Sequence, residues 1–354
     1  HPCGNNRGGC EQLCIVKYLP APVAQCICQP GYILVGTSCL EQIPEEFLLY
    51  VSERPGLIKG VPLDEPGAKE VMMPITGLGR PTTLDFHTRT GFIIYSDVQR
   101  KVIEKRKIDG SMHVPLVSDG IINVEGLAVD WLADNLYWTD EGRSCIFVCK
   151  LDDSSKRLIL VHEDLSNPRA IAVNPPAGQM YWSVWQLSQH SEHKAKIETA
   201  WMNGDHREVL VGDGLMWPNG LTLDLEKQQL YWCDGHTNKI ERIDLNGNDR
   251  TVILSLSNSH MYGLSYYKNH LYWSDFKEGS IHRMSTNPSA LQQLQGIIDA
   301  AGGAPNKPKK ERTPWPSSNR ATEASFTDGM IFVAGKDSGS GTFVARSDYR
   351  GEAL

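Results

Sequence analysis

Several features that would point to other classes of protein are missing from this sequence of 354 residues. No apolar run approaches the roughly 18–20 residues that a membrane-spanning helix requires, so we expect no membrane span in this chain. Positive charge does not predominate, because the formal net charge is −7. Nucleic acid is therefore not expected as a partner, and the acidic excess fits a partner that brings basic residues. No Asn-x-Ser/Thr sequon occurs, so no N-linked glycan is expected.

Cysteine is dense at the start of the chain and scarce afterwards. Six of the nine cysteines lie in the first 39 residues, and the next one is Cys145. A segment of about 40 residues cannot bury a sufficient core by itself, and disulfides compensate for this only in an oxidising compartment. The spacing does not give two CxxC pairs, which disfavours the alternative of a zinc site. We therefore predict an extracellular disulfide-rich module at 1–40 and a linker at 41–46.

The first residue is His1 rather than an initiator methionine. We expect either that a leader was removed or, preferably, that this chain is a piece of a longer protein.

The other three cysteines are Cys145, Cys149 and Cys233. Cys145 and Cys149 fall on one face of a predicted strand, but four residues of strand span about 13 Å. A disulfide needs Cα atoms within about 7 Å. Buried free thiols are therefore predicted.

From residue 47 onward a short aromatic, polar and acidic motif recurs about every 40–50 residues, and periods in this range are typical of β-propeller blades. The copies begin at Ile94, Tyr137, Tyr181, Tyr231 and Tyr272, with a degenerate first copy at Leu49–Glu53. An apolar strand led by a small residue, as in Gly126–Asp130, comes before the motif, and the strand after it ends in a tight turn, as at Asp109-Gly110, Asn203-Gly204 and Asn246-Gly247. The prediction is an all-β chain whose 47–354 region is a six-bladed propeller with four strands in each blade.

The motif set resembles the YWTD repeats, or class B repeats, of the low-density lipoprotein receptor family. The run from Cys26 to Tyr32, followed by Cys39, is similar to the second half of an EGF-like module. The resemblance covers residues 1 to about 285. It implies the disulfides Cys3–Cys14, Cys10–Cys26 and Cys28–Cys39, whereas spacing alone allows fifteen connectivities. The acidic start that calcium-binding EGF modules use is absent, so no calcium is expected there.

The resemblance also implies that each motif aspartate ties its blade to a neighbour through backbone hydrogen bonds. Val184 and Glu53 replace this aspartate in two repeats, so those two seams are expected to be weaker.

Residues 286–354 depart from the repeat pattern. The proline-rich and basic stretch 302–319 indicates a flexible insertion. The segment 327–333 matches the pattern of an innermost strand, and we expect it to return to residues 47–54 and close the ring.

The residues that precede the innermost strands are expected to converge on one mouth of the central channel. In the aligned repeats these are Thr82, Glu125, Arg169, Asn219, Tyr262 and, as a further candidate, Asp328. Trp217 lies just before Asn219, and Trp185 follows the fourth motif. Such a mixture suits an extended peptide or a basic side chain.

In the related propellers of nidogen and the Wnt co-receptors, the matching Asn and Arg read short Asn-containing peptides. The resemblance therefore implies a ligand site at Asn219 and Arg169, to which we add Glu125, Trp217, Tyr262 and Trp185. The alternative is that the Trp217–Gly220 segment only shapes a turn.

The resemblance implies a non-catalytic piece of an endocytic receptor at the extracellular face of the plasma membrane and in endosomes, or a secreted protein. Its expected partners are protein or peptide ligands, either lipoprotein-receptor-type cargo or complement-type repeats of the same receptor. No cofactor or metal is expected. The alternatives are a calcium-dependent lactonase or esterase that uses Glu125, Asn219 and Asp328, and a matrix adhesion module like that of nidogen.

Release of ligand in acidic endosomes would involve histidine, whose charge changes in that pH range. The histidines considered are His190, His193, His206, His236, His260 and His282.

Overall fold

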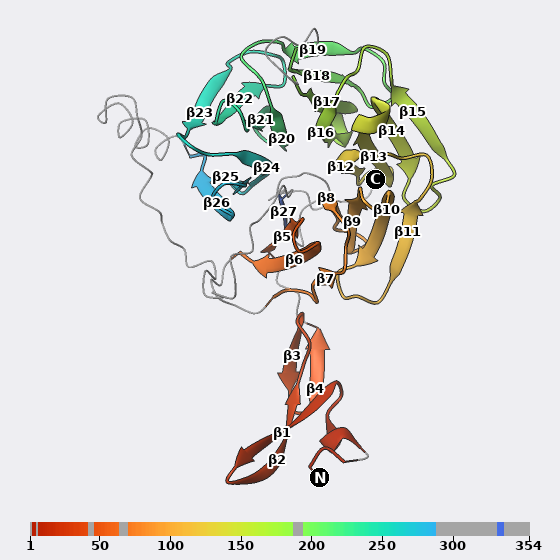
Figure 1. Cartoon of the computed structure of the whole chain (residues 1–354), viewed down its shortest axis with the longest axis vertical. Helices are drawn as coiled ribbons and strands as arrows, with labels where there is room; N and C mark the ends of the chain where they lie inside the picture. The colour runs from red at the N-terminus through yellow and green to blue at the C-terminus, as the bar shows by residue number, and fades with distance from the viewer. Residues whose placement is uncertain are drawn as a thin grey trace, which may run out of the picture.

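The computed structural model describes residues 2–4, 6–41, 46–63, 70–186, 194–287 and 331–335. The first part of the chain forms a narrow stalk of two small hairpins below a ring of sheets (Figure 1). The stalk contains a short 3-10 helix η1 (Arg7–Gly9) and strands β1 (Leu13–Leu19), β2 (Ala21–Ile27), β3 (Tyr32–Val35) and β4 (Ser38–Glu41). Its disulfides are Cys3–Cys14, Cys10–Cys26 and Cys28–Cys39, the pairing that the resemblance implies.

The ring is a six-bladed propeller, and its strands pair only with antiparallel neighbours within each blade (Figure 1). Blade 1 contains β27 (Ile331–Gly335), β5 (Glu46–Ser52), β6 (Leu57–Pro62) and β7 (Ile75–Thr76), from the axis outward. Blade 2 contains β8 (Pro81–His87), β9 (Phe92–Asp97), β10 (Val102–Lys107) and β11 (His113–Val117). Blade 3 contains β12 (Val124–Asp130), β13 (Asn135–Asp140), β14 (Cys145–Lys150) and β15 (Arg157–Val161).

The other half of the ring repeats this order. Blade 4 contains β16 (Pro168–Asn174), β17 (Gln179–Val184), β18 (Lys196–Trp201) and β19 (Glu208–Val211). Blade 5 contains β20 (Pro218–Asp224), β21 (Gln229–Asp234), β22 (Lys239–Asp244) and β23 (Thr251–Ser255). Blade 6 contains β24 (Met261–Tyr267), β25 (His270–Asp275) and β26 (Ser280–Ser285).

For blade 6 the described residues give three strands, and the residues from 288 to 330 that follow β26 lie outside the described part of the chain. Strand β27 lies between blades 6 and 2 and pairs antiparallel with β5, with Ile331 opposite Tyr50. Its described residues are Ile331–Gly335, and residues 327–330 of the expected strand lie outside the described part of the chain. The stretch 302–319 and Asp328 lie outside it as well.

The motif residues alternate between the two faces of the second strand in each blade, so both faces are buried against neighbouring blades. Trp138, Trp182 and Trp232 are fully buried there. The cores of successive blades form continuous apolar clusters around the ring. Because no blade can bury its faces alone, each blade is stable only when the neighbouring blades are in place.

The motif aspartates hold the segments that cross from one blade to the next. The Asp140 carboxylate accepts hydrogen bonds from the backbone N–H of Ile122 (2.8 Å) and Asn123 (3.0 Å), which connect blade 2 to blade 3. Equivalent bonds are made by Asp97, Asp234 and Asp275. A buried carboxylate thus satisfies the backbone donors of each such crossing.

In two repeats, which lack the motif aspartate, other contacts hold the segment that crosses between blades. Val184 is fully buried in an apolar cluster with Leu165 of the preceding connector, so an apolar contact replaces the carboxylate. Glu53 forms an ion pair with the Arg80 side chain of the next connector, at 3.0 Å. That these two seams are weaker than the others remains a prediction.

Arginines at the start of the outermost strands add a second link that the sequence analysis missed. Each guanidinium binds the connector that enters its own blade. The contacts are Arg157 to the Asp119 carboxylate (2.7 Å), Arg207 to the Asp164 carbonyl (2.8 Å) and Arg250 to the Asp213 carbonyl (2.9 Å).

The three remaining cysteines are free thiols in the interior. Burial raises the pKa of Cys149 and of Cys233 to about 12, and it also raises the pKa of Cys145. Because the thiolate is the reactive form, these groups are inert in the folded chain. Within the described ranges, no helix is long and apolar enough to cross a membrane.

Ring closure by β27 can be tested by truncation. A chain that ends at Gly303 lacks the innermost strand of blade 1, which leaves the inner edge of β5 unpaired. We expect this chain to lose cooperative thermal unfolding, measured by calorimetry and far-ultraviolet circular dichroism. A transition as sharp as that of the full chain would show that β27 does not close the ring.

The role of the motif aspartates predicts a large effect at Asp234. This carboxylate accepts from four backbone N–H groups, those of Met216, Trp217, His236 and Thr237. Asp234→Ala leaves these partly buried donors without their acceptor, and we expect the free energy of unfolding in urea to fall by about 3 kcal/mol.

The matched control is Asp213→Ala, which removes a carboxylate that is 92% exposed and is expected to cost less than about 1 kcal/mol. Equal losses in the two variants would rule out the special role of the motif aspartate.

Candidate functional site

The second residue of each innermost strand lies at the same end of the ring, because these strands all run away from that end. In the register of the structure these residues are Thr82, Glu125, Arg169, Asn219 and Tyr262. Four of them are buried, and the Arg169 side chain is 14% exposed. The structure therefore brings the predicted residues together at one mouth, while Asp328 lies outside the described residues.

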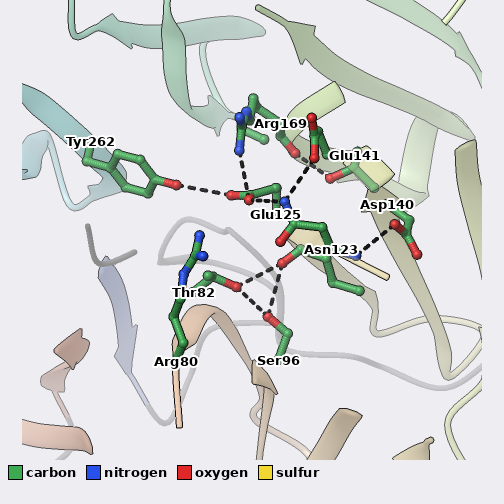
Figure 2. Close-up of polar contacts among 12 residues, drawn as sticks. Arg80, Thr82, Ser96, Asn123, Glu125, Asp140, Glu141, Arg169 and Tyr262 are labelled. Carbon is green, nitrogen blue, oxygen red and sulfur yellow. Dashed lines mark hydrogen bonds and ion pairs between the residues drawn. The ribbon is translucent and has the colours of Figure 1, made fainter. Parts of the chain in front are cut away.

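Glu125 is the centre of this group (Figure 2). Its carboxylate forms an ion pair with Arg169 Nη1 at 2.7 Å and accepts a hydrogen bond from Asn123 Nδ2 at 2.9 Å. The Tyr262 hydroxyl donates to the other carboxylate oxygen at 3.2 Å. Since Tyr262 belongs to blade 6 and Glu125 to blade 3, this bond joins opposite sides of the mouth.

Arg169 is also held from its other side. Its guanidinium lies over the Trp185 ring, 3.8 Å from the ring centroid. The ion pair with Glu125 and this cation–π contact fix the plane of the guanidinium, so little side-chain entropy remains to be lost when a ligand binds.

Aromatic rings continue from Trp185 across blades 5 and 6, and we call this group the aromatic arc. Trp217 lies 6.0 Å from Trp185, 5.0 Å from His236 and 5.8 Å from His260, measured between ring centroids. His260 in turn lies 5.6 Å from Phe276, which is 39% exposed. The aromatic arc is Trp185, Trp217, His236, His260 and Phe276.

The Asn219 side chain makes a structural hydrogen bond through its amide nitrogen, while its Oδ1 has no partner among the described residues. Its Nδ2 donates to the Met261 carbonyl at 2.6 Å, which links blade 5 to blade 6. A Cβ at Gly235 would lie 2.5 Å from this nitrogen, so the neighbouring turn can approach only because it has glycine there. Asn219 therefore has a structural role, while the binding role of the Trp217–Gly220 segment stays a prediction.

Three buried polar atoms at the mouth have no hydrogen-bond partner among the described residues. They are the Nε of Arg169, the Nε1 of Trp185 and the Oδ1 of Asn219. A buried polar atom without a partner is costly. Two donors and one acceptor beside an aromatic surface match a group that both accepts and donates, such as a carboxamide or a peptide bond.

Thr82 does not contribute to this set. Its hydroxyl lies 2.7 Å from the Ser96 hydroxyl and 2.8 Å from the Val124 carbonyl, to which it donates. The first contact lies within blade 2, and the second crosses the seam from blade 2 to blade 3 (Figure 2). Its position in the ring was predicted correctly, but its side chain is structural.

The histidines are distributed over both ends of the ring. Only His236 and His260 join the aromatic arc. His206 stacks on Trp201 at the opposite end, with 3.5 Å between centroids, and His282 stacks on Trp273 within blade 6. His190 and His193 lie outside the described residues.

The mouth offers a poor site for a divalent cation. Glu125 already shares its oxygens with Arg169, Asn123 and Tyr262. The guanidinium at 2.7 Å would repel a cation that approached the same carboxylate. Across the described ranges, no group of three or more His, Cys, Asp or Glu side chains could hold a metal ion.

Comparison with known proteins agrees with the repeat architecture. The model of the low-density lipoprotein receptor repeat class B matches residues 134–175 and 178–225. The human low-density lipoprotein receptor-related protein 5-like protein is 34% identical over 194 residues, which cover 55% of this chain and 74% of that protein. The chain belongs to the low-density lipoprotein receptor class B repeat family.

Other members of the family and a solved structure extend the comparison. The Drosophila melanogaster vitellogenin receptor Yl is 31% identical over 269 residues, or 73% of this chain. The match spans only 13% of that receptor's length. A chain in the crystal structure of a nidogen/laminin complex is 28% identical, with a TM-score of 0.60, and the match covers 68% of this chain and 89% of that chain.

The contacts of Glu125 predict a large cost when Arg169 alone is removed. Arg169→Met leaves a buried carboxylate without its cation, and we expect the free energy of unfolding in urea to fall by about 3 kcal/mol. The double variant Arg169→Met/Glu125→Gln removes the uncompensated charge and should recover more than half of this loss. Additive losses in the double variant would mean that the two side chains do not form a coupled pair.

Proposed function

We propose that this chain is a non-catalytic, extracellular part of an endocytic receptor, and that it binds protein ligands at the propeller mouth. The observation that carries the proposal is the arrangement of Arg169. The guanidinium is pinned between Glu125 and Trp185, and the unpartnered Oδ1 of Asn219 lies at the same mouth. A rigid set of unsatisfied donors and an acceptor beside aromatic rings is suited to an extended peptide.

The expected ligand atoms follow from this chemistry. The oxygen of a ligand carboxamide can accept from both Arg169 Nε and Trp185 Nε1 while its NH2 group donates to Asn219 Oδ1, which would give all three buried atoms a partner. An adjacent apolar side chain would rest on the aromatic arc, where Trp217 and Phe276 are partly exposed. Glu125 holds Arg169 through their ion pair, and Tyr262 in turn donates a hydrogen bond to Glu125.

The extracellular setting is supported by the disulfide-rich module, because such bridges persist only in an oxidising environment. The segments 121–131 and 200–204 most resemble low-density lipoprotein receptor-related protein 1. We therefore place the chain in a larger receptor that acts at the cell surface and in endosomes. Its partners would be lipoprotein-receptor-type cargo or complement-type repeats of the same receptor.

Acid-dependent release of ligand is a further part of the proposal. His236 and His260 both contact Trp217, so a positive charge on either ring would lie beside the ring that receives the ligand. This charge would weaken the binding of a basic or apolar cargo, whereas it would not release a ligand that is rich in carboxylates.

A second candidate is a matrix adhesion module. The observation in its favour is the likeness to a chain of the nidogen/laminin complex, at a TM-score of 0.60. It would use the same mouth and differ in its partner. The lactonase or esterase alternative is disfavoured by Arg169, which occupies the carboxylate that a calcium ion would need.

The test is a pull-down with the full chain immobilised, from conditioned medium and from solubilised cell-surface proteins. It is run at about pH 7.4 and at about pH 5.5, which spans the range in which histidine titrates. We expect bound proteins at neutral pH, an altered set at acidic pH, and loss of the neutral set from the Asn219→Ala/Trp217→Ala variant.

The matched control is Asn246→Ala/Trp201→Ala, which makes the same two substitutions at the opposite end of the ring, where Trp201 is 47% exposed. If the mouth variant retains the same partners as the wild type, the mouth is not the binding site. If only extracellular matrix proteins are captured, the adhesion candidate replaces the receptor.

A further inference from the structure

The mouth has a second side whose chemistry differs from that of the aromatic arc. In every blade the turn between the second and third strands lies at the mouth end, since each second strand returns there. In blades 4, 5 and 6 this turn carries Trp185, His236 and Phe276. In blades 1, 2 and 3 it carries basic residues instead.

We call these basic residues, together with one from the connector before blade 2, the cationic arc. They are all exposed: Arg54, Arg80, Arg100, Lys101 and Arg143. Among the described residues, Arg54, Lys101 and Arg143 have no ion-pair partner. Three cations that are free of carboxylates on one rim form a site for negative charge.

The carboxylates of the same blades already have partners at this end: Glu141 accepts a hydrogen bond from Asn123 Nδ2, and Asp119, which is 79% exposed, is paired with Arg157. Asp97 and Asp140 are fully buried and accept backbone N–H groups of the connectors. Glu104 is buried and paired with Arg100 at 3.0 Å, and Glu53 is paired with Arg80. Consequently, this part of the mouth is cationic although the chain has a formal net charge of −7.

Arg80 connects the cationic arc to the centre of the mouth. Its side chain is 49% exposed, and Figure 2 shows it rising beside Thr82 toward Glu125. Because Arg80 lies directly before β8, whose Thr82 belongs to the ring of mouth residues, the cationic arc reaches the mouth at blade 2.

We propose that the ligand is an acidic peptide segment, whose carboxylates bind the cationic arc while a neighbouring part enters the site at Arg169 and Asn219. The inference rests on the proposed function and deepens it by naming the chemical class of the ligand. It differs from the expectation, drawn from net charge alone, of a partner that brings basic residues, and that expectation stays a prediction. Net charge averages over the whole surface, whereas a ligand responds to the charges around its own site.

A peptide suits the surface better than a sulfated polysaccharide does. A polyanion needs repeated cations along its length, but the turns of blades 5 and 6 contribute only Lys277, which is bonded to Asn258 and followed by Glu278. The opposite side offers indole rings and buried hydrogen-bonding atoms, which match side chains and amides.

The experiment measures binding of fluorescent synthetic peptides to the full chain by anisotropy. The peptides share one central core that contains asparagine and carry a flanking run of aspartates, serines or lysines on either end. We expect the aspartate peptide to bind about tenfold more tightly than the serine peptide at about 50 mM salt, and this advantage to disappear at about 500 mM salt.

The variant Arg54→Gln/Lys101→Gln/Arg143→Gln should remove this tenfold advantage, since each exposed charge pair contributes a factor of about two. It should leave binding of the serine peptide unchanged. The matched control Lys150→Gln/Lys156→Gln/Lys268→Gln removes the same charge from turns at the opposite end of the ring and should change neither peptide.

The outcomes separate this inference from the proposed function. If aspartate and serine peptides bind equally and Asn219→Ala weakens both, the acidic preference is wrong and the mouth site stands. A preference for aspartate that depends on the three cations but not on Asn219 would support the cationic arc and overturn the site at Asn219. If no peptide binds but a heparin fragment does, with the same dependence on the three cations, the partner is a polysaccharide and the inference is overturned.

Discussion

The ring depends on buried carboxylates that hold the chain where it crosses from one blade to the next. A backbone that turns between two sheets leaves N–H groups that neither sheet can satisfy, and Asp97, Asp140, Asp234 and Asp275 accept them. These crossings also form the rim of the mouth. The interaction that closes the fold therefore positions the residues available to a ligand, and His236 lies next to such a carboxylate.

The mouth combines structural and recognition roles in the same side chains. Asn219 links two blades through one amide atom and leaves the other without a partner, and Arg169 neutralises Glu125 while its Nε remains unsatisfied. Such incompletely satisfied groups are usually avoided in a protein interior, because each costs free energy. Their presence together at one mouth is the physical reason for placing the ligand there.

The sequence predicted the features that repeat and missed those that depend on ring closure. The recurring motif gave the blades, and alignment of the copies gave the residues at the mouth, because each copy occupies the same place in its sheet. The hydrogen bond between Tyr262 and Glu125 could not be predicted, since it joins residues 137 positions apart that meet only across a closed ring. The contacts of Arg157, Arg207 and Arg250 could have been found from their common position in the repeats.

Two properties of the surface also needed the structure. Phe276 gave no signal in sequence because a single exposed aromatic is common on any surface, and its contact with His260 is what joins it to the aromatic arc. The cationic arc could not be inferred from the net charge, since most carboxylates of blades 2 and 3 near the mouth are buried.

The most direct test of the account is an experimental structure of the full chain with a bound acidic, asparagine-containing peptide. We predict a ligand amide in contact with Arg169 Nε, Trp185 Nε1 and Asn219 Oδ1, and carboxylates beside Arg54, Lys101 or Arg143. A peptide bound at the other end of the ring or along its outer strands would contradict it.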